Sequence, residues 1–138
     1  MQFVLLIYES PEGFAIRNND GKDSYTAAWR AYHKAIVNAG IFVGGDPLQV
    51  PETGTTVRIK DGKRHVQDGP YADTKEQLGG FTILDLPSLD EALEWAARCP
   101  AASIGAVPCV RLPTNSSGLP PPPTTYSRYH CRRCSSGT

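Results

Sequence analysis

The residues best suited to acid–base chemistry begin a polar stretch at residues 68–80, which reads Asp-Gly-Pro-Tyr-Ala-Asp-Thr-Lys-Glu-Gln-Leu-Gly-Gly. Asp68, Gly69 and Pro70 form a strong turn signal, because Asp can bond nearby backbone, Gly allows a positive φ and Pro restricts φ. Loops on a rigid scaffold often carry function, so Asp68 is a candidate general acid or base. The same carboxylate could instead only hold its own turn, and both interpretations remain open.

Two further residues could move protons. His33 lies in a predicted helix, and imidazole is the side chain that titrates near neutral pH without help from its surroundings. Asp46 lies between a Gly-Gly pair and Pro47, where the chain after the helix could bring it close to His33. The alternatives are a partly buried structural histidine and an aspartate that only forms a turn.

The polar stretch also supplies candidate ligand contacts. Gly69 should adopt a positive φ or let a ligand approach the backbone closely. Tyr71 offers an aromatic wall with a hydroxyl group. We therefore expect both residues to contribute to a small-molecule site near Asp68.

The cysteines do not predict a metal site. Cys99 and Cys109 fall in predicted regular elements, where a free cysteine behaves as a small hydrophobe. Cys131 and Cys134 form a Cys-x-x-Cys pair beside His130, which is only half of the four-ligand set of a structural zinc site. No P-loop, Gly-x-Gly-x-x-Gly, His-Glu-x-x-His or Gly-x-Ser-x-Gly pattern occurs, which argues against the functions that these motifs mark.

An α+β fold should position these candidates. Hydrophobic patterns predict helices over about residues 24–39 and 89–97 and strands at the ranges 2–8, 41–43, 81–86 and 104–111. Asp61-Gly62 predicts a hairpin between residues 53–60 and 63–67. Leaving this inserted β-hairpin aside, the order is βαββαβ, the ferredoxin-like pattern, with helices on one face of an antiparallel sheet.

Local signals set the limits of these elements. Residues 10–22 read as a loop, and Asp23 or Ser24 would cap the first helix. A capping box at Ser88 begins the second helix, and Pro108 should place the last strand at an edge or end it early. The uninterrupted apolar run at residues 2–8 predicts a central strand buried on both faces.

Composition and charge limit the classes of protein to which this chain can belong. The 138 residues carry no formal net charge, and residues 1–111 hold 11 Lys and Arg against 14 Asp and Glu. A mildly acidic domain is not expected to bind nucleic acid. The chain has no apolar run long enough to span a membrane and no signal-peptide pattern, so we expect a cytoplasmic protein that does not contact membranes.

Residues 112–138 differ in composition from the preceding chain. They are rich in Pro, Ser and Thr, which predicts a disordered tail with polyproline stretches. Such a tail could arise from a frameshift, or it could be a proline-rich ligand for an aromatic groove. The sequence therefore divides into a domain at 1–111 and a tail at 112–138.

Several motifs in their order resemble the DGPF-motif group of YCII-related proteins. Asp-Gly-Pro followed by an aromatic residue, here Tyr71, and then by Thr-Lys-Glu-Gln-Leu-Gly-Gly-Phe carries most of the resemblance. Further matching segments lie at residues 43–45, 48–51, 55–58 and 89–97, and the resemblance extends over about residues 1–107. It implies a homodimer whose two sheets close into an α/β barrel.

The resemblance also bears on the site. Some relatives outside this group use a His–Asp dyad with the histidine on the first helix, and Trp29 occupies that position here. His33 lies one turn later on nearly the same helix face. The dyad is therefore not carried over intact, and Trp29 becomes a candidate ligand contact.

Two functions from different classes remain. The first is an enzyme that binds a small organic molecule and moves a proton on it without a cofactor, as isomerases and lyases on dimeric ferredoxin-like barrels do. The second is a non-catalytic ligand-binding or regulatory accessory protein, because members of the resembled group are often encoded beside alternative sigma factors. Neither hypothesis identifies the ligand.

Overall fold

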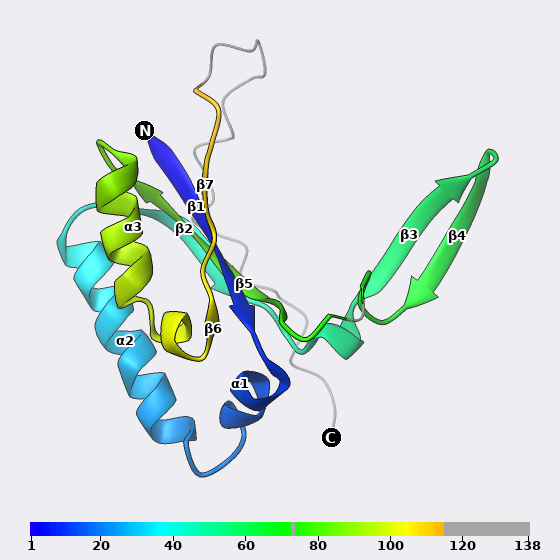
Figure 1. Ribbon diagram of the computed structural model, residues 1–138, viewed down its shortest axis with the longest axis horizontal. Helices are drawn as coiled ribbons and strands as arrows, with labels where there is room; N and C mark the ends of the chain where they lie inside the picture. The colour runs from blue at the N-terminus through cyan, green and yellow to red at the C-terminus, as the bar shows by residue number, and fades with distance from the viewer. Residues whose placement is uncertain (73, 115–138) are drawn as a thin grey trace, which may run out of the picture.

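The computed structural model describes residues 1–72 and 74–114, which form an antiparallel sheet, three helices and a two-stranded arm (Figure 1). The sheet runs in the order β2 (Phe42–Pro47), β5 (Gln77–Asp85), β1 (Gln2–Glu9), β6 (Gly105–Ala106), and β7 (Cys109–Arg111) also pairs with β1. Its strand pairs are antiparallel. This arrangement agrees with the predicted ferredoxin-like α+β class; most of the predicted tail lies outside the described residues.

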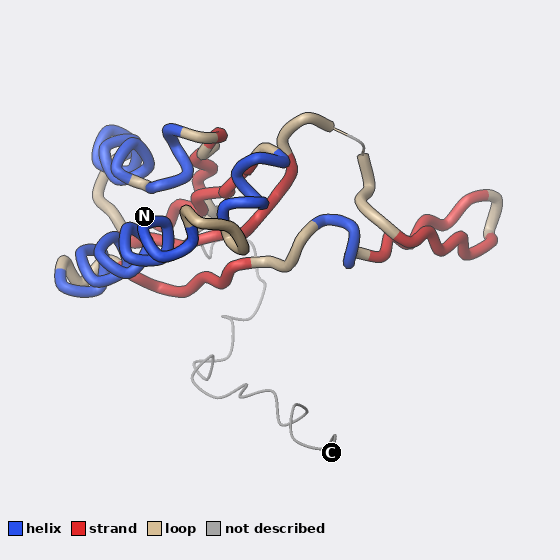
Figure 2. Tube along the Cα trace, turned by 90° about the horizontal axis from the view of Figure 1, so that it is seen from below, coloured by secondary structure: helices blue, strands red, loops and turns tan. Residues whose placement is uncertain are grey.

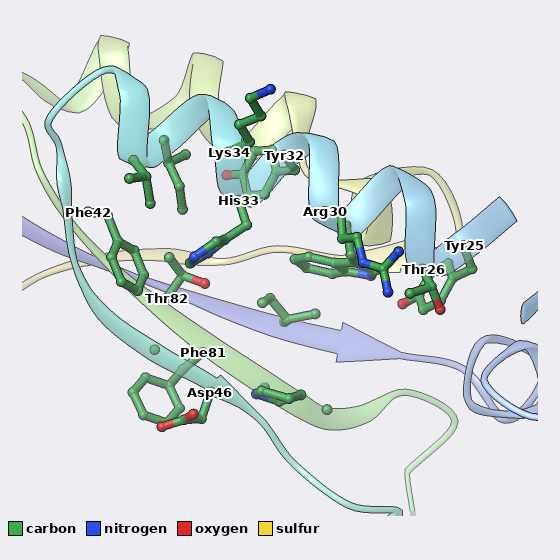
Figure 3. A pocket seen from close by; sticks show the side chains of 18 of the residues that line it. Tyr25, Thr26, Arg30, Tyr32, His33, Lys34, Phe42, Asp46, Phe81 and Thr82 are labelled. Atoms are coloured by element: carbon green, nitrogen blue, oxygen red, sulfur yellow. The ribbon is translucent and has the colours of Figure 1, made fainter. Parts of the chain in front are cut away.

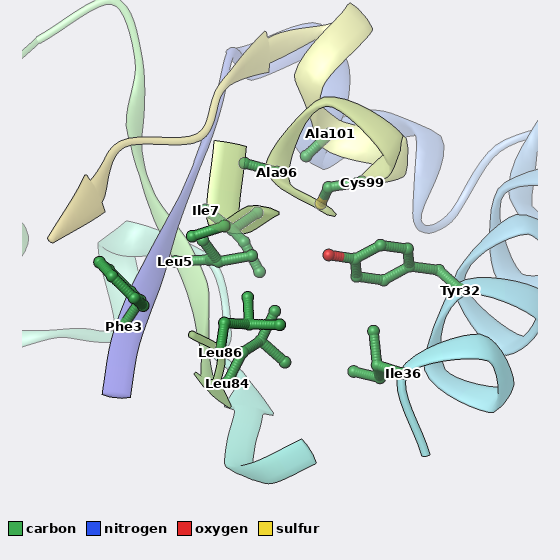
Figure 4. Close-up of a cluster of buried hydrophobic side chains, with 11 residues drawn as sticks. Phe3, Leu5, Ile7, Tyr32, Ile36, Leu84, Leu86, Ala96, Cys99 and Ala101 are labelled. Atoms are coloured by element: carbon green, nitrogen blue, oxygen red, sulfur yellow. The ribbon is translucent and has the colours of Figure 1, made fainter. Parts of the chain in front are cut away.

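Helices α2 (Lys22–Asn38) and α3 (Leu89–Arg98) pack on one face of the sheet, and the short helix α1 (Pro11–Ile16) follows β1. Two single 3₁₀ turns, η1 (Pro51–Thr53) and η2 (Pro100–Ser103), connect elements. The core lies between the helices and the sheet, where Tyr32 and Ile36 of α2 point toward Leu5 and Leu84 (Figure 4). Burying these side chains supplies the main stabilisation of the domain.

The central strand β1 is buried on one face rather than on both as predicted. Phe3, Leu5 and Ile7 are at most 5% exposed, whereas the alternate residues Val4 and Leu6 are only half-buried. Side chains alternate between the two faces of a strand, and the helices cover only one of them. The continuous apolar run therefore marks a second face that no helix among the described residues covers.

The segment predicted as a loop at residues 10–22 contains helix α1. Ser10 caps it by accepting a hydrogen bond from the Gly13 N–H at 3.2 Å, and Pro11 occupies the first turn, where its missing N–H costs nothing. The N-cap of α2 is Gly21, without a side-chain bond, instead of Asp23 or Ser24. The predictions missed α1 because six residues are too few to show a helical period.

The polar stretch predicted as a loop at residues 68–80 is shorter in the structure. β4 extends to Asp68, and β5 begins at Gln77. Gly80 pairs with both Ile7 and Pro47, so the two glycines at the end of the stretch belong to the sheet.

Other local signals are confirmed. The Ser88 hydroxyl accepts from the Glu91 N–H at 3.3 Å at the start of α3, and Gly40 follows α2 with φ of 72°, as a helix stop requires. Pro108 separates β6 from β7, and both short strands lie at the sheet edge beside β1. The missing N–H of proline explains this interruption.

The arm consists of β3 (Thr55–Lys60) and β4 (Lys63–Asp68), which pair with each other in a separate two-stranded sheet. Asp61 and Gly62 have φ of 52° and 74°, as a type I′ hairpin turn requires. Figures 1 and 2 show the arm extending away from the sheet and helices.

Gly105 is the tightest glycine position among the described residues, and we expect Gly105→Ala to destabilise the fold. An added Cβ would lie 2.0 Å from the backbone oxygen of Tyr8, so β6 would have to move away from β1. We expect a loss of about 1–3 kcal/mol in the free energy of unfolding, the usual cost of overpacking. Urea denaturation would measure it, with Gly44→Ala as the control because no atom lies within 4 Å of a Cβ there.

Candidate functional site

A cavity of about 660 Å³ lies between α2 and the sheet. Its walls come from α2, β1, β2 and β5, and Figure 3 shows several of the side chains that face it. Most of its surface is apolar or aromatic, contributed by Ile7, Trp29, Tyr32, Ile36, Val37 and Phe42. Ligand pockets in proteins commonly have this size and character, with a few polar groups that orient the ligand.

Two of the predicted site residues lie together in this cavity. The ring of His33 packs edge-on against Phe42, with ring centres 4.9 Å apart, and points from α2 toward Thr82 (Figure 3). Trp29 also lines the cavity and makes edge contacts with Tyr25 and Tyr32 at 6.2 and 5.9 Å. Helix α2 therefore presents an imidazole beside a row of aromatic rings.

Asp46 borders the cavity but does not face His33. The strand register pairs Asp46 with Phe81, and paired residues point to the same side of a sheet. Figure 3 shows both side chains on the side of the sheet away from α2. The structure thus does not form the His33–Asp46 pair that the sequence left open, because the register places the two side chains on different faces.

The other three predicted site residues lie at the base of the arm and do not line this cavity. Asp68 is the last residue of β4 and is exposed. Gly69 has the expected positive φ, 95°, and its N–H donates to the Gly54 oxygen at 2.8 Å. Tyr71 is 72% exposed and its ring lies under the Arg58 guanidinium at 4.8 Å. Their roles in chemistry or ligand binding stay predictions.

A buried carboxylate that was not predicted from the sequence lies at one end of the cavity. Glu9, the last residue of β1, is 1% exposed. Its carboxylate accepts from the Arg17 guanidinium at 2.9 Å and from the Tyr25 hydroxyl. A single acidic residue at the end of a long apolar strand was the only available signal, because its partners lie 8 and 16 residues away.

Arg17 connects three parts of the fold through this cluster. Besides Glu9 on β1, its guanidinium donates to the backbone oxygens of Gly79 on β5 and Leu48 after β2. A Cβ on Gly79 would lie 2.9 Å from both the Arg17 and Glu9 side-chain atoms, so a larger residue there would displace the pair. The cluster therefore holds these three parts of the fold together at the end of the cavity.

Burial raises the pKa of several titratable groups near the cavity and core. Burial, followed by the hydrogen bond to Glu9, raises the pKa of Tyr25 to about 12. Burial also raises the pKa of the Cys99 thiol to about 11 and raises the pKa of Tyr32 well above its usual range. The neutral forms of these groups are the ones that the folded state favours.

These shifts predict a loss of stability at high pH. The folded-state pKa values exceed the ordinary values of 9.0 for Cys99 and 10.0 for Tyr25. The stabilisation of the fold by these neutral groups is therefore complete below pH 9.0 and is lost as pH rises toward about 12. Urea denaturation between these limits would measure it. Tyr25→Phe should show a smaller pH dependence above pH 10.0; an unchanged slope would contradict the assignment to Tyr25.

Within residues 1–72 and 74–114, no group of three or more His, Cys, Asp or Glu side chains is arranged to hold a metal ion. In that same part of the chain, no helix has the length and apolar character needed to cross a membrane.

Comparison with known proteins identifies the family. The profile of the YCII-related domain matches residues 1–112. The chain belongs to the YCII-related family. A relative from Rhizobium meliloti (strain 1021), described as an uncharacterized protein, is 40% identical over 87 residues. That alignment covers 54% of this chain and 69% of the relative.

A solved structure resembles this YCII-related chain more distantly. It is 5-chloro-2-hydroxyhydroquinone dehydrochlorinase (TftG) from Burkholderia phenoliruptrix AC1100, in complex with 2,5-dihydroxybenzoquinone. The two chains are 22% identical, the match covers 82% of this chain and 94% of the other, and the TM-score is 0.48.

Proposed function

We propose that the α2 cavity binds a small, mostly apolar organic molecule and that the protein moves a proton on it with its own side chains, as an isomerase or lyase would. The observation that supports this best is the position of His33, a proton-transferring side chain that lines a mostly apolar cavity of about 660 Å³. Imidazole is the side chain that most often serves as general acid or base in enzymes. A flat ring would fit among the aromatic side chains of Trp29 and Phe42.

The Glu9 cluster would orient the ligand at the other end of the cavity. The Tyr25 hydroxyl donates its proton to Glu9, so its oxygen remains able to accept a hydrogen bond from a bound molecule. Arg17 already donates to Glu9, Gly79 and Leu48. We therefore assign proton transfer to His33 and orientation to Tyr25.

A second candidate is a non-catalytic binding protein, acting as a regulatory accessory to an alternative sigma factor. One observation favours it: in the described part of the chain, no carboxylate is hydrogen-bonded to His33, so the imidazole lacks the orienting partner of a His–Asp dyad. Without that partner the cavity could hold a ligand and leave it unchanged.

We further propose that the protein is a homodimer of the DGPF-motif group and that its open sheet face is the interface. The side chains on the face away from the helices are half-buried within one chain and mostly apolar: Val4, Leu6, Tyr8, Phe81 and Ile83. A contiguous apolar face of this kind is typical of an interaction surface. Sedimentation velocity should give the mass of a dimer, and a monomer at micromolar concentration would refute the proposal.

The enzyme and binding hypotheses can be separated in one experiment. A library of small organic molecules is screened by thermal shift, because a ligand that binds only the folded state raises Tm. Each stabilising compound is then incubated with the protein in ²H₂O and followed by NMR. The enzyme hypothesis predicts loss of a carbon-bound proton signal or conversion of the compound, whereas a compound that binds and stays unchanged would support the accessory-protein hypothesis.

A further inference from the structure

The arm, β3 and β4, makes few contacts of its own with the rest of the described chain. Eleven of its twelve strand residues are exposed, and the two strands form a sheet of their own. Figures 1 and 2 show from two directions that it extends beyond the sheet and helices. An isolated two-stranded hairpin is at best marginally stable in water, so the arm needs a contact that the described part of one chain does not supply.

One face of the arm carries an apolar strip, beside Arg64 and Asp68 on the same face. Val57 is paired with Val66, and Ile59 follows on the same face, since alternate residues of a strand point the same way. These three side chains are 58%, 54% and 70% exposed. Single exposed apolar residues need no explanation, but a strip of them on an element that extends away from the rest of the described chain indicates a contact surface.

The charge of the arm is opposite to that of the body, by which we mean residues 1–54 and 69–111. Residues 55–68 carry four Lys or Arg and two Asp, whereas the body carries seven Lys or Arg and twelve Asp or Glu. A basic ribbon and an acidic body of the same chain attract each other when they come from different copies. The charges alone could attract a nucleic acid, but the apolar strip requires an apolar surface against it.

We propose that the arm of each protomer lies on the body of a second copy of this chain, with Val57, Ile59 and Val66 against it. The inference rests on the homodimer proposed above and is independent of the chemistry in the α2 cavity. Twofold symmetry would form the contact twice, once for each arm. Exchange of arms would bury the apolar strip and bring Arg64, which shares its face, close to the acidic body.

Photo-cross-linking of the full-length chain tests this placement. The photoreactive residue p-benzoylphenylalanine is introduced at Ile59, and unlabelled protein is mixed with ¹⁵N-labelled protein before irradiation. Mass spectrometry should find cross-links between chains of different label that join position 59 to the body. The yield should fall as salt is raised, because salt screens exposed charges.

The matched control carries the same probe at Lys60, the next residue on the opposite face of β3, and should cross-link several-fold less. A protein that sediments as a dimer but shows only cross-links within one chain, between two arms, or equally from both positions would refute the arm contact and leave the dimer standing. A monomer in sedimentation would refute both.

Discussion

Replacing Arg17 with leucine should lower the free energy of unfolding by about 3 kcal/mol, because it would leave the carboxylate of Glu9 buried without its cation. Glu9 is 1% exposed and Arg17 is 23% exposed, so we expect the lower end of the range known for broken buried pairs. The variant would also lose the bonds to Gly79 and Leu48. In a domain of this size the melting temperature should fall by about 10 °C.

The double variant Arg17→Leu/Glu9→Gln provides the control for this prediction. Glutamine removes the buried charge and keeps a side-chain oxygen for the Tyr25 hydroxyl, so the double variant should be more stable than Arg17→Leu alone. Urea denaturation of both singles and the double gives the interaction energy of the pair. If Arg17→Leu lowers the free energy of unfolding by less than about 0.5 kcal/mol, the Arg17–Glu9 pair contributes no more than a solvent-exposed ion pair does.

The largest effect on activity should come from His33→Gln. If His33 transfers the proton, glutamine keeps hydrogen-bonding groups but cannot exchange a proton, and the rate should fall by roughly 10²–10⁴. The rate of proton exchange or conversion in ²H₂O, with the compound found by thermal shift, would measure this. Because His33 is exposed, its replacement should change Tm little.

His65→Gln is the matched control for this prediction. His65 is the other histidine among the described residues, it is exposed on the arm, and it lies outside the cavity. Its replacement should leave the rate unchanged. Equal rates for wild type and His33→Gln would remove His33 from the chemistry and leave the cavity as a binding site.

Much of the fold follows from local signals. The apolar run of β1, the stop at Gly40, the cap at Ser88 and the interruption at Pro108 each act within a few residues, so the sequence indicates them directly. Helix α1 and the strand register of Asp46 could not be predicted from local signals. The first is too short for a period, and the second depends on pairing with Phe81, which lies 35 residues further along the chain.

Only part of the candidate site could be predicted, because only part of it depends on residues that are close in the sequence. His33 and Trp29 share one face of α2, and helical spacing suffices to bring them together. Glu9 meets Arg17 and Tyr25 only through tertiary packing, which a single sequence does not reveal. The turn at Asp68 was predicted from its residues, but its distance from the cavity depends on where the arm points.

The most direct test of the proposed site is a crystal structure of the protein with the compound that raises Tm most. We predict that the compound lies between α2 and the sheet, with a polar atom within hydrogen-bond distance of His33 and its opposite end near Tyr25. A compound bound instead at the turn of Asp68, Gly69 and Tyr71, with the α2 cavity empty, would contradict the account and restore that turn as the functional site.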